Sequence, residues 1–302
     1  MNGIIIIDKP KDYTSFDVVA VIRKLLGEKK IGHTGTLDPM ATGVLPILIG
    51  RATKLQSFIM EADKEYIAEF RLGVVTDTLD ITGKVIASMS SQVKKSDVEA
   101  ALMQFKGGIK QVPPMYSAVQ KNGVRLYNLA RRGIEVEREE REVFIHELKL
   151  LSFDDTLQAG TFLVNCSKGT YVRTLCDDIG KKLSCGAVLT GLRRIKTCDF
   201  NIENSVALDE AKNFAINGTL KEHILPCDVI LKQYMKIEIS TAQVNRFQNG
   251  GSLSLDRVSG LGEANQGELV RIYSCGRKFI GLGRVNVEKK EISTACLIEI
   301  SK

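Results

Sequence analysis

The sequence predicts a protein of mixed helices and strands, with a large N-terminal unit at 1–229 and a smaller β-rich unit at 230–302. In the first unit, short apolar runs alternate with segments whose apolar residues recur at helical spacing. In the second, short strand-like runs are separated by tight turns that contain glycine. A chain of 302 residues is long enough for two domains. The alternation by itself is compatible with an α+β or an α/β fold.

The chain begins with a predicted buried strand over 3–8, which consists largely of isoleucine. An amphipathic helix is expected next, with Ser15 as its N-cap and Gly27 as its end. The apolar run 44–49 contains Pro46, and a proline argues against a central strand because it donates no backbone hydrogen bond. A short helix over 52–61 and a strand over 65–74 are expected to follow.

A long polar excursion over 109–142 interrupts the regular pattern. It contains Pro113-Pro114, two glycines and many charged residues, and loops of this length usually serve a function. Before it, Ser96 and Glu99 match a capping box at the start of a helix. The other elements expected in the first unit are strands over 143–151 and 161–166 and helices over 170–183 and 207–217. Those expected in the second unit are strands over 235–239, 268–273, 278–285 and 295–300.

Composition and charge argue against several classes of protein. No apolar run approaches the roughly 20 residues that a membrane helix requires, and the N-terminus lacks the basic region of a signal peptide. The seven cysteines are scattered without a C-x-x-C pair and there are three histidines, so neither a disulfide framework nor a metal centre is expected. We therefore expect a cytoplasmic protein with reduced thiols. The net charge of +6, concentrated at 23–30, 121–132 and 193–196, suits a polyanionic partner.

The loop IGHTGTLDPMATG at 31–43 carries a single carboxylate, Asp38, among glycines and threonines that contribute little to a core. Pro39 pushes Asp38 into an extended conformation, and Gly35 and Gly43 allow the backbone to lie close to a ligand. A carboxylate in such a loop can act as a nucleophile or base, or bind a metal, but an ordinary Asp-Pro turn is the more common use of these residues. The loop is not a phosphate-binding P-loop, because it lacks the G-K-[ST] ending.

Other polar residues are ambiguous when each is taken singly. Asp77 and Asp80 are interpreted as part of a polar turn, because no further carboxylates follow at calcium-loop spacing. The ordinary interpretation of Tyr66 is an aromatic side chain that packs in the core, and that of Arg173 is a charged side chain on the surface. His33 is most simply a loop histidine whose hydrogen bonds are satisfied.

Seven motifs, taken in order, closely resemble those of the TruB family of tRNA pseudouridine synthases: IIIIDKP, GHTGTLDPMATGVLPI, ADKEYIAEFRLG, TDTLDITG, QVPPMYSAVQKNG, SKGTYVRTLCDDIG and LRRIKT. The resemblance covers roughly residues 1–230, and the tail is similar to the small PUA-like domain of many bacterial members. It implies the α+β pseudouridine synthase fold: a mixed, largely antiparallel central sheet with flanking helices, an RNA-binding insertion at about 109–142, and a small C-terminal β-barrel-like domain that binds RNA.

The activity implied by the resemblance is that of an isomerase. Members of the family convert uridine 55 in the T-loop of tRNA to pseudouridine: the base flips out, its N1–C1′ bond breaks, and C5 bonds to C1′. Because nothing is oxidised and no group is imported, no cofactor or metal is expected. A monomer that binds the tRNA T-stem-loop, without a membrane or a protein partner, is also implied. The alternatives are a tRNA-binding or folding factor with secondary or no catalysis, and a glycosylase that releases uracil.

The resemblance assigns roles to the residues that match its motifs. Asp38 matches the catalytic aspartate, which either attacks C1′ or removes a sugar proton on the way to a glycal. Arg173 would pair with Asp38 through a bidentate guanidinium, and Tyr66 would stack on the target base and act in proton transfer. Further assignments are Tyr171 in the pocket wall, His33 at the flipped nucleotide, Lys9 and Pro10 at the pocket floor, and Lys121, Arg125, Arg131 and Arg132 in RNA binding.

Two positions depart from the family pattern. Asp12 stands where the first motif usually has glycine, and Thr197-Cys198 stands where a small residue and a glycine are frequent. Aspartate tolerates a positive φ better than most residues, so the turn at Asp12 is expected to survive with modest strain.

Overall fold

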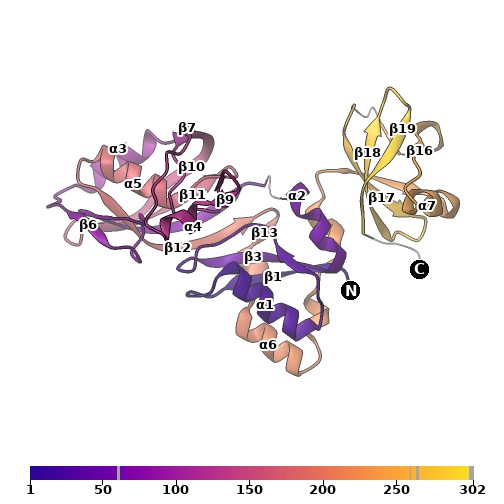
Figure 1. The fold of residues 1–302 in the computed structure, drawn as a ribbon, viewed down its shortest axis with the longest axis horizontal. Helices are drawn as coiled ribbons and strands as arrows, with labels where there is room; N and C mark the ends of the chain where they lie inside the picture. Colours follow the sequence, from indigo (N-terminus) through magenta and orange to yellow (C-terminus); the bar gives the residue numbers. More distant parts are fainter. Residues whose placement is uncertain (60–61, 259, 263–264, 299–302) are drawn as a thin grey trace.

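The computed structural model describes residues 1–59, 62–258, 260–262 and 265–298, which form two β-sheets with helices packed on them (Figure 1). The strands of the larger sheet are β1 (Gly3–Lys9), β2 (Ile31–His33), β3 (Thr42–Ile49), β4 (Lys64–Leu72), β7 (Gly107–Gln111), β10 (Arg141–Asp154), β11 (Ala159–Cys166), β12 (Ala187–Thr197), β13 (Phe200–Asn201) and β14 (Val206–Ala207). The helices of this part are α1 (Ser15–Leu26), α2 (Gln56–Ile59), α3 (Lys95–Met103), α4 (Leu126–Ala130), α5 (Val172–Lys182) and α6 (Leu208–Ile216), with 3-10 turns at Gly50–Leu55, Ile202–Asn204, Leu220–His223 and Cys227–Ile230. Two small hairpins pair β5 (Val74–Thr76) with β6 (Val85–Ser88) and β8 (Gln120–Lys121) with β9 (Val124–Arg125).

The smaller sheet contains β15 (Met235–Ile239), β16 (Leu253–Ser254), β17 (Leu269–Ser274), β18 (Phe279–Asn286) and β19 (Glu291–Leu297), beside α7 (Thr241–Gln248) and a 3-10 turn at Leu255–Arg257.

The larger sheet is mixed and mostly antiparallel, which confirms the α+β prediction. Its main order is β14-β1-β3-β12-β4-β11-β10-β7, while β13 pairs with β12 and β2 pairs with β3. The β1–β14 and β12–β3 pairs are parallel. The smaller, curled sheet has the order β15-β17-β18-β19-β16. Strand pairing, rather than the alternation of elements in the sequence, therefore decides between α+β and α/β.

Helices α1, α3, α5 and α6 share one hydrophobic core with the larger sheet. Helix α1 contributes Val18, Val19 and Ile22, while α5 contributes Leu175 and Ile179. Figure 1 shows α1 and α6 beneath β1 and β3, with α3 and α5 at the other end of the sheet. The loop that carries the candidate aspartate connects β2 to β3, close to the middle of this core.

Helix α1 has the predicted bounds, but the prediction of Ser15 as its N-cap was wrong. The Thr14 hydroxyl accepts a hydrogen bond from the Asp17 amide at 3.0 Å, and the Asp17 carboxylate accepts one from the Thr14 amide at 2.8 Å. Ser15 is buried and hydrogen-bonds Leu37 instead. Gly27 ends the helix in the left-handed conformation, with φ 62°.

The prediction that Pro46 disfavours a central strand was also wrong. Strand β3 pairs with β1 along its whole length, and Pro46 lies opposite Ile6. The Pro46 carbonyl accepts a hydrogen bond from the Thr34 amide at 3.2 Å, just after β2 has ended at His33. The proline nitrogen faces that same side, where the partner strand has ended, so no ladder hydrogen bond is lost.

The sequence analysis did not predict β12, which lies between β3 and β4 and completes the centre of the sheet. Its apolar pattern is broken by Arg193 and Arg194, and two bulges shift its register against β4. The Arg194 side chain is nonetheless buried, with a relative exposure of 1%. The sequence suggests that this basic pair lies on the surface. In the fold, Arg194 is buried and Arg193 is partly exposed.

Smaller differences concern the ends of elements. The Ser96–Glu99 capping box is not used, because α3 begins at Lys95 and the Asp97 carboxylate accepts the Lys94 amide. The predicted helix over 52–61 is a 3-10 turn followed by α2, and its residues 60–61 lie outside the described residues. Strand β19 begins at Glu291 rather than 295, and residues 299–300 of the prediction also lie outside the described residues.

Both departures from the family pattern adopt the left-handed backbone that glycine favours. Asp12 has φ 66° and Cys198 has φ 54°. The turn at Asp12 keeps its function, because the Asp12 amide donates to the Pro39 carbonyl at 2.8 Å. A non-glycine residue in this region costs on the order of 1 kcal/mol each, a strain that the surrounding contacts offset.

The smaller sheet is joined to the larger one by a second apolar core. Leu282 of β18 and Cys296 of β19 pack in one cluster with Ile4 of β1 and Leu48 of β3. In Figure 1 the smaller sheet lies beyond α2, at the end of the molecule that also holds the N-terminus. In the described part of the chain, every helix is too short or too polar to cross a membrane.

We predict that Gly43→Ala destabilises the protein strongly. Gly43 has φ +106°, and an added Cβ would lie 2.1 Å from the Arg194 carbonyl oxygen across the β3–β12 pair. A backbone atom cannot move aside as a side chain can, so we expect a loss of about 3 kcal/mol in the free energy of unfolding. Urea unfolding measures the change. Gly108→Ala, where no atom lies within 4 Å of the added Cβ, is the matched control; equal effects of the two substitutions would contradict the prediction.

Candidate active site

The loop that carries Asp38 is fixed by hydrogen bonds to α1. The buried Ser15 hydroxyl accepts a bond from the Leu37 amide at 2.8 Å and donates to the Leu37 carbonyl at 3.2 Å. Within the loop, the Asp38 carbonyl accepts a bond from the Ala41 amide at 3.0 Å. The loop around Asp38 is therefore held by the Ser15 side chain and by a hydrogen bond within the loop, and its carboxylate projects from a fixed base.

Lys9 holds the same loop from below. Its side chain is fully buried, and its ammonium group donates to the Pro39, Tyr13 and Pro10 carbonyls at 3.2, 2.6 and 2.9 Å. Burial lowers the pKa of Lys9 to about 8, although the negative charge of Asp38 opposes this shift. Neither Lys9 nor Pro10 lines the pocket, and Lys9 supports the aspartate loop; the predicted role of the two residues at the pocket floor stays a prediction.

Arg173 lies beside Asp38 at the start of α5, with only 4% of the residue exposed. Its Nε atom is 2.9 Å from Asp38 Oδ2, so the expected ion pair is present. The expected bidentate fork is not formed, because the other nitrogens have different acceptors. Nη1 donates to the Thr78 carbonyl at 3.1 Å and lies 3.5 Å from Asp80 Oδ2, and Nη2 donates to the Tyr116 carbonyl at 2.8 Å.

Asp80 is the site residue that the sequence analysis passed over. Its interpretation as part of a turn is correct but incomplete: Oδ1 accepts bonds from the Thr78 hydroxyl at 2.9 Å and from the Thr82 amide at 3.0 Å. The other oxygen, Oδ2, faces the guanidinium of Arg173. Asp80 is 5% exposed, and a carboxylate this deeply buried is rare unless it has a charged partner. The motif TDTLDITG was the available signal, but calcium-loop spacing was the wrong test for it.

The charges around Asp38 decide its protonation. Burial raises the pKa of Asp38, and the nearby Asp80 raises it further, while Arg173 and Lys9 lower it; the net shift is upward. About a third of the side chain, 36%, still opens to the pocket. The result is a carboxylate that is held by a cation yet is a better proton acceptor than an aspartate in water.

Tyr66 forms part of the pocket beside Asp38. It lies on β4 directly across from Arg194 of β12, and it is 8% exposed. Burial raises the pKa of the Tyr66 phenol, while the charge of Arg194 and a hydrogen bond with its guanidinium act in the opposite direction. Tyr66 is therefore a neutral phenol at neutral pH, able to donate or accept one hydrogen bond.

A pocket of about 680 Å³ brings most of the predicted residues together. Asp38, Tyr66, Tyr171 and Arg173 all line it, and the Tyr171 amide is held by the Gln111 side chain at 3.0 Å. His33 is not part of the lining. Its Nδ1 accepts a bond from the Gly35 amide at 3.3 Å, and burial lowers its pKa, so it stays neutral and braces the loop.

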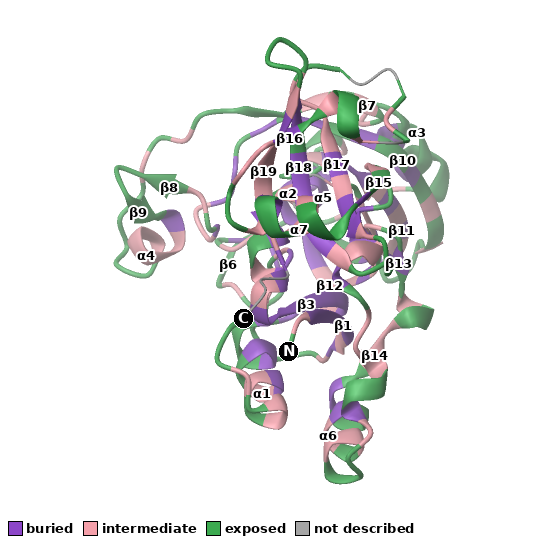
Figure 2. Cartoon of the chain, turned by 90° about the vertical axis from the view of Figure 1, so that its right-hand side faces the viewer, coloured by how far each residue is buried: buried purple, intermediate pink, exposed green. Residues whose placement is uncertain are grey.

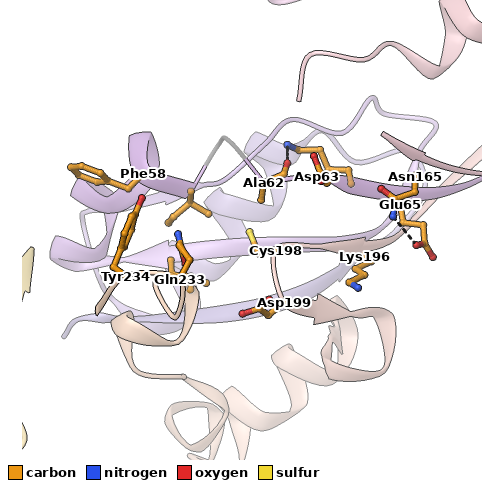
Figure 3. Close-up of a pocket in the computed structure, with 13 residues that line it drawn as sticks. Phe58, Ala62, Asp63, Glu65, Asn165, Lys196, Cys198, Asp199, Gln233 and Tyr234 are labelled. Atoms are coloured by element: carbon orange, nitrogen blue, oxygen red, sulfur yellow. Dashed lines mark hydrogen bonds between the residues drawn. The ribbon is translucent and has the colours of Figure 1, made fainter. Parts of the chain in front are cut away.

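A second cavity, of about 560 Å³, lies near the first and shares Lys64 with it (Figure 3). Phe58 and Tyr234 stand at one end, while at the other the Asn165 amide donates to Glu65 at 3.4 Å. Its charged lining residues are Asp63, Glu65 and Asp199 against Lys64 and Lys196. Acids outnumber bases, so this cavity does not suit a nucleic acid phosphate.

The basic residues of the excursion are exposed on a small lobe that stands away from the main body (Figure 2). Lys121 and Arg125 belong to the β8–β9 hairpin, while Arg131 and Arg132 follow α4. The Arg125 and Arg131 guanidinium carbons lie 5.9 and 5.5 Å from the centre of the Tyr127 ring. These residues do not reach the pocket, so the structure separates a cationic surface from the candidate reacting group.

Within 1–59, 62–258, 260–262 and 265–298, no three histidine, cysteine, aspartate or glutamate side chains are grouped so as to hold an ion. Asp38 and Asp80 face the same guanidinium instead. The arrangement can bind a polar ligand at the bottom of a pocket, and it can present a carboxylate as nucleophile or base.

We predict a bell-shaped dependence of the single-turnover rate on pH. We expect Asp38 to react as a carboxylate, so the rate should fall as pH drops through its raised pKa, above the ordinary value of about 3.9. It also falls as pH rises past about 8, where Lys9 loses the charge and one of the protons that hold the loop. Rapid-quench assays across this range measure both limbs, and a rate that stays flat from neutral pH to well above 8 would contradict the role given to Lys9.

We predict that Asp80→Asn slows the reaction by about tenfold and leaves substrate affinity within about threefold. The amide keeps an acceptor for the turn but removes the charge that fixes Arg173. Loss of this negative neighbour also lowers the pKa of Asp38, so the acid limb moves to lower pH.

The matched control is Asp77→Asn, in the same turn, where the carboxylate only accepts the Lys84 amide. We expect this variant to keep both rate and pH profile. An Asp80→Asn enzyme with the rate and acid limb of the wild type would show that the second carboxylate has no part in the site.

Three family models match consecutive parts of the chain. Residues 23–172 match the TruB family pseudouridylate synthase N-terminal domain. Residues 173–232 match the tRNA pseudouridylate synthase B C-terminal domain, and residues 236–290 match the C-terminal region of pseudouridine synthase II TruB.

Similar proteins extend over nearly the whole chain. The chain is 46% identical to tRNA pseudouridine synthase B of Clostridium tetani, over 95% of this chain and 97% of the relative. It is 44% identical to the protein of the same name from Clostridium kluyveri, over 94% and 95%. A solved Cbf5-Nop10-Gar1 complex contains a chain with 26% identity and a TM-score of 0.72, covering 99% of this chain and 84% of that one. The chain belongs to the TruB family of pseudouridylate synthases, and it is an isomerase of that family.

Proposed function

We propose that this protein isomerises uridine 55 in the T-loop of tRNA to pseudouridine. The relatives named above are tRNA pseudouridine synthases, which supports tRNA as the substrate class. The position within the tRNA follows from the resemblance of the motifs around Asp38, Tyr66 and Arg173. The bond from N1 to C1′ breaks, the uracil turns within the pocket, and C5 bonds to C1′ while the proton on C5 is lost and N1 gains one.

The observation that carries this proposal is the position of Asp38. Its carboxylate contacts the buried Arg173 at 2.9 Å and faces a pocket with a third of its surface open. A protein that only binds or folds tRNA needs no such group, because phosphate recognition uses exposed cations. Asp38 either attacks C1′ or removes a sugar proton to form a glycal, and its raised pKa serves both routes.

A uridine stacked in a loop must leave the stack to reach this carboxylate. Flipping costs a few kcal/mol, and contacts with the RNA must offset that cost. The pocket of about 680 Å³ has room for a flipped nucleotide, and Tyr66 in its wall would stack on the uracil and take part in proton transfer. Tyr171 would contact the same nucleotide, and His33 would act from behind the loop.

The lobe between β7 and β10 would hold the tRNA T-stem-loop over the pocket. Lys121, Arg125, Arg131 and Arg132 present four cations there. The Tyr116 carbonyl at the base of the lobe accepts a bond from Arg173, so binding at the lobe has a direct connection to the site. We assign residues 1–229 to a catalytic domain, and residues 230–302 to a PUA-like domain that adds RNA contacts, in a protein that acts as a monomer.

The proposal is tested with an unmodified tRNA transcript. The wild-type protein is expected to produce a carbodiimide-dependent primer-extension stop at position 55. Asp38→Asn is expected to lower the rate at least about a thousandfold while tRNA affinity stays within about threefold, because the amide cannot act as nucleophile or base. Asp155→Asn, in the exposed β10–β11 turn, is the matched control and is expected to match the wild type.

Each other outcome rejects a defined part of the proposal. A stop at a different position would reject uridine 55 and keep the activity. Free uracil among the products would indicate a glycosylase. Tight binding without any pseudouridine in the wild-type reaction would leave a tRNA-binding factor, and full activity of Asp38→Asn would reject the assigned aspartate.

A further inference from the structure

Arg194 has an environment that the roles assigned above do not explain. It lies in the middle of the larger sheet, on β12, and 1% of the residue is exposed. Its Nε atom donates to the Val44 carbonyl at 2.7 Å, and its Nη2 atom donates to the Gly35 carbonyl at 3.3 Å. Across the sheet its register partner on β4 is Tyr66. One side chain therefore contacts β3, the aspartate loop and the strand that carries the tyrosine.

This guanidinium is buried without a carboxylate partner. In the described part of the chain, it donates to two carbonyl oxygens, lies opposite Tyr66 across the sheet, and forms no ion pair with an acid. Burying an arginine is costly unless a specific gain requires it. Arg193, the next residue, shows the ordinary alternative, since it is partly exposed and pairs with Asp8 at 2.7 Å. Burying the guanidinium therefore costs much more free energy for Arg194 than for Arg193, and Arg194 is the residue that faces the pocket.

We propose that Arg194 is a positioning residue that holds the Tyr66 side chain and the Asp38 loop in fixed relation to each other. Its planar fork spans acceptors on different elements at once, which a flexible ammonium group cannot do. The backbone is built for this approach: Gly43 pairs with Arg194 across β3 and β12, at a distance that leaves no space for a Cβ. Loss of the fork would free the loop at Gly35 and let the tyrosine move away from the bound base.

This inference rests on the proposed function, since it assigns Arg194 to the same reaction. A positioning role differs from a purely structural one in what it changes. If the tyrosine and the aspartate are misplaced, the bound substrate reacts more slowly. A general loss of structure instead weakens folding and tRNA binding together. The separation of single-turnover rate from tRNA affinity is therefore the readout.

The test compares three variants with the wild type. Arg194→Met keeps the length and removes every donor, and we expect a rate at least about thirtyfold lower with tRNA affinity within about threefold. Arg194→Lys keeps a charge without the fork, and its rate is expected to fall between those of the methionine variant and the wild type. Arg193→Met removes the neighbouring, partly exposed ion pair and is expected to keep the rate within about twofold.

The outcomes separate this inference from the proposed function. If the wild type makes no pseudouridine, the proposed function fails first. If the wild type is active and Arg194→Met keeps its rate, or loses rate and affinity in equal measure, the positioning role is rejected. If the methionine variant does not fold, Arg194→Lys decides: a slower rate at wild-type affinity supports the role, and a wild-type rate overturns it.

Discussion

The candidate site depends on one buried guanidinium between two carboxylates. Arg173 contacts Asp38 through one nitrogen and Asp80 through another, and backbone carbonyls from two further segments complete its shell. Burial is the main cause of the raised pKa of Asp38; the charge of Arg173 opposes this rise, and Asp80 adds to it. The arginine thus fixes the direction of the carboxylate, while burial, with a smaller contribution from the second acid, keeps it basic.

The geometry around this trio is fixed largely by hydrogen bonds to the backbone. Ser15 holds the loop from α1, Lys9 holds it from β1, and Arg194 holds it from β12. Such supports allow a reacting group to meet its substrate without reorganisation, which is how enzymes gain most from electrostatic interactions. The sequence-based expectation that this loop contributes little to a core was wrong, because Leu37, Met40 and Ala41 are buried in the main apolar core and anchor the loop together with these hydrogen bonds.

The cationic lobe is separate from the pocket that holds Asp38, whose lining has cations of its own in Lys64, Arg141 and Lys168. In the lobe, the exposed Arg125 and Arg131 lie over the Tyr127 ring, and in the lining of the second cavity acids outnumber bases. The Tyr116 carbonyl, which contacts Arg173, is a physical link between the two regions. At the other end, a shared apolar core fixes the smaller sheet to β1 and β3.

The sequence by itself determined local features: α1 and its glycine end, most of the long strands, the motifs that indicate the family, and Asp38 as a candidate reagent. Burial and partners were decided only by the tertiary structure. From the sequence, Asp80 is interpreted as part of a turn and Arg194 as a surface charge. Their contacts are with residues that only folding brings close. Strand β12 escaped prediction for the same reason, since its arginine is satisfied by carbonyls of other strands. A charged residue carries no mark in the sequence of whether water or protein will surround it.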